Sequence, residues 1–212
     1  MKQNKKKGKG AVIVMAYTAC AAYISDNITK DCAAPLAGGY TGRGFLVAVK
    51  DIKALTYDVN NSRIVTAITL KTGAKVAVID NVFSPTPLTG SNTQSNTDDG
   101  MMKFRKNITV SVPRRGAGAS EEIVEPTFQA PLGYVACLEK KDRSGDGSFE
   151  LIGLEQGLLA TADGIVRDEY ANGGCTMITM SCNETIFEYS FYDTDYDTTL
   201  TAFETILSTS AF

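Results

Sequence analysis

Residues 107–112 read Asn-Ile-Thr-Val-Ser-Val, in which polar and apolar side chains alternate with a period of two. Successive side chains of an extended strand point to opposite faces of a sheet. Ile108 and the two valines therefore share one face, and Thr109 and Ser111 share the other. The stretch predicts a β-strand with one face on a hydrophobic core and one polar face.

The chain holds further segments of strand length. Apolar runs or alternations bounded by turn residues indicate strands at 45–49, 63–70, 75–79, 132–138, 149–154, 176–182 and 185–192. Turn signals predict three hairpins, which join 63–70 to 75–79, 132–138 to 149–154, and 176–182 to 185–192. We therefore expect a mainly β protein, an antiparallel β-sandwich or barrel of about eight strands with one or two short helices.

Helix signals are confined to two short segments. Residues 120–124 begin with a serine, a favoured N-cap residue, and continue with two glutamates, and we expect Pro126 to end this helix. Residues 198–207 space leucine and phenylalanine at helical intervals, with Asp197 or Thr198 as the cap.

Residues 84–100 (SPTPLTGSNTQSNTDDG) have a different composition, with two prolines, two glycines and almost no large apolar side chain. A connection of this length is unusual inside a compact domain, so we expect a projecting loop or an arm that orders on a partner. The predicted organisation is a basic N-terminal arm and lead-in strand at 1–22, followed by a single β-rich domain at 23–212 that carries this loop.

The sequence contains no histidine. This absence excludes Ser–His and Cys–His nucleophiles and every His-ligated metal site. The five cysteines are scattered, and even the closest pair, Cys175 and Cys182, lacks the spacing of metal ligands. They fit reduced thiols used as small apolar side chains. We therefore predict no catalytic residue, no metal and no cofactor.

Two acidic motifs suggest chemistry that their context does not support. Residues 142–147 start like a calcium-binding loop, but Gly153 stands where that loop needs a glutamate. Residues 195–199 match the D-x-D-x-T of aspartyl-phosphate phosphatases, yet the alternation of strands and helices in that class is missing. A hairpin turn and a solvated acidic connection are the favoured interpretations. The sequence indicates a non-enzymatic protein, and a β-rich hydrolase that uses carboxylates is the competing class.

Charge is distributed unevenly along the chain. Residues 1–10 carry five lysines and no acid, whereas from residue 163 to the end there are nine acids and a single base, Arg167. Opposite charges at the two ends suit head-to-tail docking of copies, and a solvated tail with a solvated acidic face explains them equally well. Residues 101–115 carry five basic residues and no acid. This segment indicates either an edge strand protected by charge or a strip that faces an acidic neighbour.

The N-terminus has two interpretations. The early lysines and the uncharged run at 11–25 resemble a secretory signal, and residues 17–20 approximate a lipoprotein cleavage site with Cys20 as the acylated residue. The favoured interpretation is a basic arm that leads into a first strand, with Met15 as an alternative start. No stretch approaches the ~20 consecutive apolar residues of a membrane-spanning helix.

Several segments carry a family resemblance when they are taken together: Ser-Asp-Asn-Ile-Thr at 25–29 with Cys32, Pro35 and Gly38-Gly39, then 63–75, and later the hairpin at 134–158. Their succession resembles virion proteins of Bacteroidota-infecting bacteriophages, including the crAss-like group, that are related to tail-tube-like ring or connector subunits. It spans about residues 23–160, and no single motif within it is specific.

The resemblance implies a tail-tube-like β-barrel or sandwich that assembles edge to edge into rings, six- or twelvefold, around a channel. Its other implied partners are neighbouring tail or portal proteins and genome DNA, which passes without sequence-specific binding, and no membrane is involved. The expected location is the virion tail, after assembly in the host bacterial cytoplasm. Residues 84–100 would form the stacking loop, and the lysines at the N-terminus an arm.

The oligomer interface predicted on this basis consists of Lys5, Lys6, Lys7, Lys9, Pro85, Pro87, Leu88, Asp98, Asp99, Lys103, Arg105, Arg114 and Arg115. The alternative function is that of an exported Bacteroidota surface lipoprotein with a β-sandwich domain acylated at Cys20.

Overall fold

The structure is a computed structural model that describes residues 39–80, 88–96, 102–112, 116–166 and 175–209. Every described residue belongs to one compact unit within residues 36–212. The arm and lead-in strand predicted at 1–22 lie outside the described residues.

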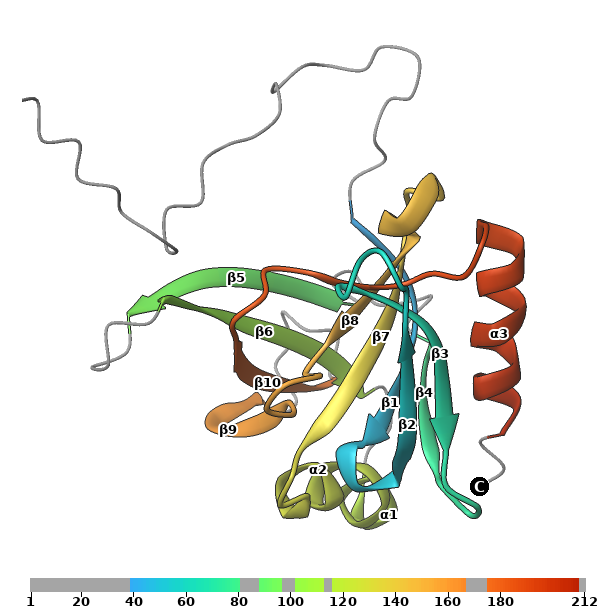
Figure 1. The fold of residues 1–212 in the computed structure, drawn as a ribbon. Helices are drawn as coiled ribbons and strands as arrows, with labels where there is room; N and C mark the ends of the chain where they lie inside the picture. Colours follow the sequence, from blue (N-terminus) through green and yellow to red (C-terminus); the bar gives the residue numbers. More distant parts are fainter. Residues whose placement is uncertain (1–38, 81–87, 97–101, 113–115, 167–174, 210–212) are drawn as a thin grey trace, which may run out of the picture. The chain divides into compact units, whose positions relative to one another are not determined.

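Seven strands form the larger sheet, called sheet A (Figure 1). Their spatial order is β2 (Ile52–Tyr57), β3 (Ile64–Leu70), β11 (Tyr189–Phe191), β8 (Phe149–Ile152), β7 (Tyr134–Lys140), β1 (Tyr40–Ala48) and β4 (Val76–Asp80). Neighbours are antiparallel except β3 and β11, which are parallel.

Four antiparallel strands form the smaller sheet, called sheet B. Their order is β5 (Leu88–Asn96), β6 (Met102–Val112), β10 (Thr176–Glu184) and β9 (Leu159–Val166). The alternation that opens the sequence argument is confirmed on β6, where Ile108 and Val112 are buried.

The one long helix is α3 (Tyr196–Ser208), near the end of the chain. Between β6 and β7 lie α1 (Ala117–Ala119), a π-helical turn (Ser120–Val124) and α2 (Glu125–Gln129), one directly after another. Short 3-10 turns occupy Val49–Asp51 and Gly145–Ser148.

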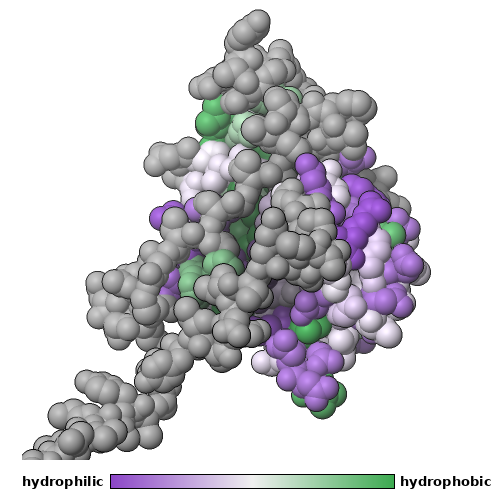
Figure 2. All heavy atoms as spheres, turned by 90° about the horizontal axis from the view of Figure 1, so that it is seen from above, coloured by the Kyte–Doolittle hydropathy of each residue, from purple (hydrophilic) through white to green (hydrophobic). Residues whose placement is uncertain are grey.

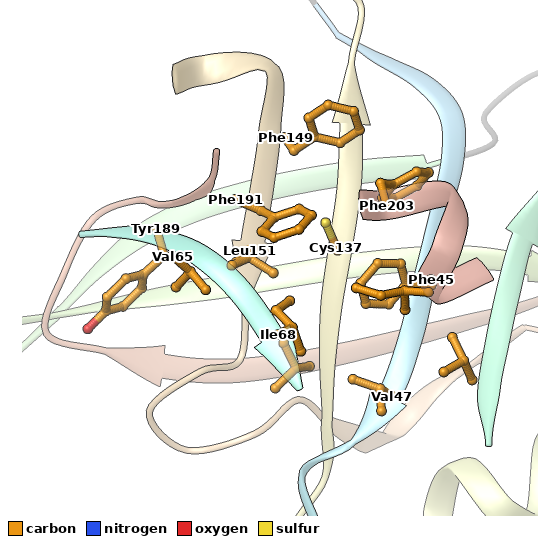
Figure 3. Packing of buried hydrophobic residues seen from close by; sticks show 13 residues of the cluster. Phe45, Val47, Val65, Ile68, Cys137, Phe149, Leu151, Tyr189, Phe191 and Phe203 are labelled. Atoms are coloured by element: carbon orange, nitrogen blue, oxygen red, sulfur yellow. The ribbon is translucent and has the colours of Figure 1, made fainter. Parts of the chain in front are cut away.

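One face of sheet A packs against α3, and the rings of four phenylalanines meet between them (Figure 3). The ring centroid of Phe203, on α3, lies 5.0 Å from that of Phe149 and 5.5 Å from that of Phe45. The buried members of this cluster are Phe45, Val47, Val65, Ile68, Val76, Val135, Cys137, Phe149, Leu151, Tyr189, Phe191, Phe203 and Ile206.

The other face of sheet A packs against sheet B. The cluster between them combines sheet A residues Ile79, Ala136, Leu138 and Ile152 with sheet B residues Ile108, Val112, Ile178, Met180 and Cys182, and adds Val124 and Leu158. The described strands therefore form a β-sandwich with a helix on its outer side, as the sequence predicts. Eleven strands are described, and their two sheets do not close into a barrel.

Both sides of β7 are consequently buried. Val135 and Cys137 belong to the cluster beneath α3, and Ala136 and Leu138 belong to the cluster beneath sheet B. A strand covered on both faces is apolar at consecutive positions, which is why this part of the sequence shows a run instead of an alternation. The predicted hairpin between β7 and β8 is confirmed.

The predicted hairpin between 63–70 and 75–79 is wrong. The turn is present, because the Ala74 N–H donates to the Lys71 carbonyl at 3.0 Å and Gly73 has a positive φ of 78°. However, β3 already has β2 on one side and β11 on the other, and β4 pairs with β1 at the opposite end of sheet A. Turn residues predict that the chain changes direction. Which strand the following segment pairs with depends on which strands still have an unpaired side.

The predicted pairing of 176–182 with 185–192 is also wrong. β10 lies in sheet B and β11 lies in sheet A, so the chain passes from one sheet to the other after Glu184. Phe187 precedes β11 and stays 49% exposed, whereas Tyr189 and Phe191 are buried on that strand.

Residues 88–96, predicted as part of a projecting loop, form the strand β5 instead. Each of its residues has a partner on β6, from Leu88 opposite Val110 to Asn96 opposite Met102. A polar composition is compatible with an edge strand because the backbone ladder holds it. The rest of 84–100 lies outside the described residues.

Two helix boundaries differ from prediction. Pro126 does not end its helix, because the π-helical turn at Ser120–Val124 precedes it and α2 continues to Gln129. Proline has no N–H to donate, and its ring clashes with the carbonyl group one turn earlier in a regular helix. A wider turn before the proline avoids this clash. The cap of α3 is Asp195, whose carboxylate accepts the Thr198 N–H at 2.7 Å.

Phe203 connects α3 to the core of sheet A, so Phe203→Ala should lower the free energy of unfolding by about 3–5 kcal/mol, the usual loss for a buried phenylalanine. Urea unfolding followed by circular dichroism measures this change. Thr205→Ala, on the exposed side of the same helix, is the control and should change stability by less than about 0.5 kcal/mol. Equal effects of both substitutions would contradict the packing of α3 described above.

Candidate assembly surface

Most residues of the predicted oligomer interface lie outside the described residues: Lys5, Lys6, Lys7, Lys9, Pro85, Pro87, Asp98, Asp99, Arg114 and Arg115. The other three belong to the two neighbouring strands at one side of sheet B. Leu88 begins β5, and Lys103 and Arg105 lie near the start of β6. The three therefore share one strand pair, but Leu88 lies opposite Val110, at the other end of the pair from Lys103 and Arg105.

The face of sheet B that points away from sheet A is polar. On β6, residues of the same parity as Arg105 point outward, because Ile108 and Val112 point inward. This face carries hydroxyl ladders to β10, in which the Thr109 and Thr179 hydroxyl oxygens lie 2.9 Å apart and Ser111 Oγ donates to Met177 Sδ at 3.1 Å. The outward positions of β6 and β10 are Lys103, Arg105, Asn107, Thr109 and Ser111, and Met177, Thr179, Ser181 and Asn183, without an acid or an aromatic ring.

Among the described residues, β5 has a neighbouring strand on one side only. Its nine residues read LTGSNTQSN, with no charged residue and no proline. Natural edge strands are commonly protected by charge, proline or a bulge, because unpaired N–H and C=O groups offer a template for another chain. β5 has none of these protections and is therefore the best candidate for contact with a second chain.

Two of the acids near the C-terminus lie on α3, on the other side of sheet A from sheet B. Asp197 and Glu204 are on the exposed side of α3, which has no basic residue. Seen from above, the part of the molecule at the right, where Figure 1 has α3, is mainly hydrophilic (Figure 2). Glu204 accepts a hydrogen bond from Arg43 at 3.2 Å. Asp197 and Glu204 therefore lie on a different layer of the molecule from Lys103 and Arg105.

Two acids at the end of β7 and β8 are buried and form structural contacts. Glu139 accepts hydrogen bonds from Tyr196 at 2.8 Å and from Thr41 at 2.9 Å, which connects the start of α3 to sheet A. Burial, together with the hydrogen bond to Glu139, raises the pKa of Tyr196 to about 12. Glu139 is thus occupied by groups that hold the fold.

Glu150 is similarly occupied on the opposite face of sheet A. Its carboxylate accepts the Tyr40 hydroxyl at 2.8 Å and lies 3.3 Å from Lys140 Nζ, which also contacts Glu188. Burial, followed by the Glu150 charge, raises the pKa of Tyr40 well above its ordinary value. The ion pairs of Lys140 outweigh its partial burial and raise its pKa as well.

The passage of the chain from sheet B to sheet A is held by two glutamates that face each other's backbone. Glu184, at the end of β10, accepts the N–H groups of Gly153 and Leu154, each at 2.8 Å. Glu155 accepts the N–H groups of Thr185 and Ile186 at 2.9 and 3.3 Å. It also accepts the hydroxyls of Thr185 and Tyr189, at 2.8 and 3.0 Å. These contacts fix the point at which residues 184–189 change sheets.

Lys106, which the sequence places in the basic segment 101–115, is fully buried. Its Nζ lies 2.7 Å from Glu184 Oε2, and neither side chain is exposed. The parity of β6 gives the signal for this position, because residue 106 falls on the same face as Ile108. The high positive charge of residues 101–115 makes an exposed position the more obvious expectation for Lys106.

The acidic motifs at 142–147 and 195–199 form local hydrogen bonds. Asp142 accepts the N–H of Ser144 at 3.1 Å and its hydroxyl at 2.7 Å, in the connection between β7 and β8. These hydrogen bonds lower the pKa of Asp142. Asp195 is the cap of α3 described above. Within the described ranges, no group of three or more Asp, Glu or Cys side chains is placed to hold a metal ion.

Comparisons with protein-family models, with curated proteins and with solved structures found no match for this chain. Among the described residues, no helix has the length and apolar character needed to cross a membrane. The candidate surface therefore depends on the geometry of β5 and β6 alone.

The anchor at Glu155 predicts a pH-dependent stability. Burial disfavours the charged carboxyl, but the four hydrogen bonds that it accepts outweigh this effect and lower its pKa. A lowered pKa means that the stabilisation is complete above the ordinary glutamate pKa of about 4.3 and is lost as the pH falls through the folded-state value. Glu155→Gln should therefore melt below wild type at pH 7, and the difference should shrink toward pH 3.

Thermal unfolding of both proteins at several pH values measures this difference. Glu121→Gln, an exposed position of the π-helical turn, is the control for removal of one acid. A difference between wild type and Glu155→Gln that stays constant down to pH 3 would show that the charge of Glu155 does not anchor the crossing.

Proposed function

We propose that this protein is a structural virion subunit that forms stacked rings of a phage tail tube or head-to-tail connector, through which the genome passes. Its partners are copies of itself, in six- or twelvefold rings, and neighbouring tail or portal proteins. The proposed location is the virion tail, after assembly in the host bacterial cytoplasm. The family resemblance of the sequence motivates the phage part of this proposal, and the observation that carries the assembly part is the unprotected edge of β5.

The edge of β5 supports assembly for a physical reason. Adding a strand from another copy would satisfy the backbone groups on its open side, and its serine, threonine and asparagine residues carry no charge that repels a partner. Lys103 and Arg105 lie on β6, which pairs with the other side of β5, and they place two positive charges one strand away from that edge. A second copy with an acidic surface would be attracted to it, and charge of this kind fixes orientation more than affinity.

The described surfaces also suit a protein past which DNA moves without being held. Tight binding of DNA requires several lysine or arginine contacts to phosphate, and single-stranded binding adds aromatic platforms. The outward positions of β6 and β10 offer two basic side chains and no aromatic ring. The exposed side of α3 adds acids and no base.

The second candidate is an exported surface lipoprotein, favoured by the signal-like sequence that ends at Cys20. A β-sandwich domain suits this function equally well. The mass of the protein from its native source separates the candidates. Loss of residues 1–19 with acyl chains on Cys20 supports the lipoprotein and contradicts the virion subunit.

Two neighbouring proline substitutions test the role of β5. Adjacent residues of an edge strand point their N–H groups alternately to the partner strand and to the open side. One of Thr93→Pro and Gln94→Pro therefore removes a β5–β6 hydrogen bond, and the other removes a donor on the open side. The variant that loses the β5–β6 hydrogen bond should have a lower melting temperature. The variant that loses the donor on the open side should melt close to wild type and fail to assemble, as measured by light scattering and electron microscopy.

Ala77→Pro and Val78→Pro on β4, an edge strand of sheet A, form the matched control pair. The member of that pair that melts like wild type should also assemble like wild type. If both β5 variants assemble normally, β5 is not the contact and the assembly proposal loses its main support.

A further inference from the structure

Lys106 and Glu184 are an unusual pair because both are fully buried side chains of ionisable residues. They lie on neighbouring strands, where Lys106 is opposite Cys182 and Glu184 is opposite Phe104. The two are therefore diagonal neighbours on the inward face, a spacing that long side chains can bridge. Nζ lies 2.7 Å from Oε2.

The surroundings of this pair are largely apolar. Ile108, Met180 and Cys182, which share its inward face, are buried, and the Tyr189 ring lies with its centroid 6.0 Å from Nζ. Burial, followed by the Glu184 charge, raises the pKa of Cys182 to about 12, so its thiol stays protonated at neutral pH and is a poor nucleophile. Lys106 Nζ, in contrast, is an amine nitrogen in direct contact with the Glu184 carboxyl.

The contact is close, but it is not a well-directed hydrogen bond. Within the described residues, neither Lys106 Nζ nor Glu184 Oε2 has a hydrogen-bond partner of good geometry. An ammonium group has three donors to satisfy, and a buried ion pair compensates its loss of hydration only when its geometry is excellent. Two charges held in this way are a costly arrangement for a core.

The other oxygen of Glu184 is held very differently. Oε1 accepts the N–H groups of Gly153 and Leu154, each at 2.8 Å. Two backbone donors at this distance are the arrangement that stabilises a developing oxyanion in acyl transfer. The backbone at Gly153 has a φ of 91°, and a Cβ there would approach the Tyr134 carbonyl oxygen to 2.5 Å. Only glycine therefore presents this pair of donors without strain.

We propose that Lys106 and Glu184 condense into an intramolecular amide, an isopeptide bond between β6 and β10. A proton moves from the ammonium to Oε2, which leaves an amine beside a carboxylic acid. The Nζ lone pair forms a bond to Cδ, and the two N–H groups hold the negative charge on Oε1. The Cδ–Oε2 bond then breaks, Oε2 takes a second proton from Nζ, and one water leaves. The step needs no oxidant and no co-reactant.

Condensation resolves the problem that the buried pair presents. It replaces two charges by one neutral amide, whose oxygen keeps both backbone donors. Holding the reacting groups in contact provides the effective concentration that an intramolecular reaction requires. The product closes a covalent loop from residue 106 to residue 184, across the strand pair at the centre of sheet B.

Mass spectrometry of the full, unfolded chain tests the proposal, with or without ring assembly. The cross-linked chain is lighter than its sequence by one water. Arg167 is the last basic residue, so trypsin releases Glu184 in the peptide 168–212. Because the amide blocks cleavage after Lys106, we expect 106–114 joined to 168–212 after digestion. A full sequence mass with free 107–114 and free 168–212 would overturn the proposal.

The chain provides an internal control. Lys140 also contacts two glutamates, Glu150 and Glu188, but its side chain is 23% exposed, and hydration favours the ion pair there. Its peptides should remain unlinked. Lys106→Arg keeps the positive charge and lacks the amine, so its mass should equal its sequence. A loss of water that persists in Lys106→Arg would place the reaction elsewhere and refute the assignment to Lys106.

Discussion

The burial of sheet A on both faces is the constraint on which the rest of the structure depends. A sheet whose central strands are apolar on both sides needs two covers, and the chain supplies them from different parts of the sequence. α3 provides one cover through Phe203, and sheet B provides the other through Ile108 and its neighbours. Strands that look like consecutive hairpins therefore belong to different layers.

The passage between the layers is held by hydrogen bonds from carboxylates to backbone groups. The chain must leave sheet B after Glu184 and enter sheet A at Tyr189. Backbone groups in such a passage lose their ladder partners, and unsatisfied buried groups destabilise a fold strongly. Glu155 and Glu184 supply those partners from opposite sides. The carboxyl group of Glu184 also contacts Lys106. The same group therefore holds the passage in place and takes part in the proposed cross-link.

Local patterns in the sequence predict the elements that depend on local physics. The period of two on β6, the run on β7 and the hairpin to β8 follow from side-chain direction and turn residues. The partner of β4 and the parallel contact of β11 depend on which strand sides are vacant, and no local pattern contains that information. The strand β5 is not predictable from its composition, because its polar residues are typical of a loop.

The candidate site was predictable only in part, for related reasons. Lys103 and Arg105 belong to the charged segment of the sequence, and they lie on β6, opposite Ser95 and Thr93 of β5. Lys106 belongs to the same charged segment but not to the predicted interface, and its parity with Ile108 places it inside. Glu184 has the same parity as Met180 and Cys182. Counting alternate residues outward from a confirmed buried position would have identified both partners.

Assembly is the central claim, and native mass spectrometry of the purified wild-type chain over a range of concentrations tests it most directly. We expect closed oligomers of six or twelve copies, with multiples of the ring as concentration rises. A chain that remains a monomer at every concentration would contradict it.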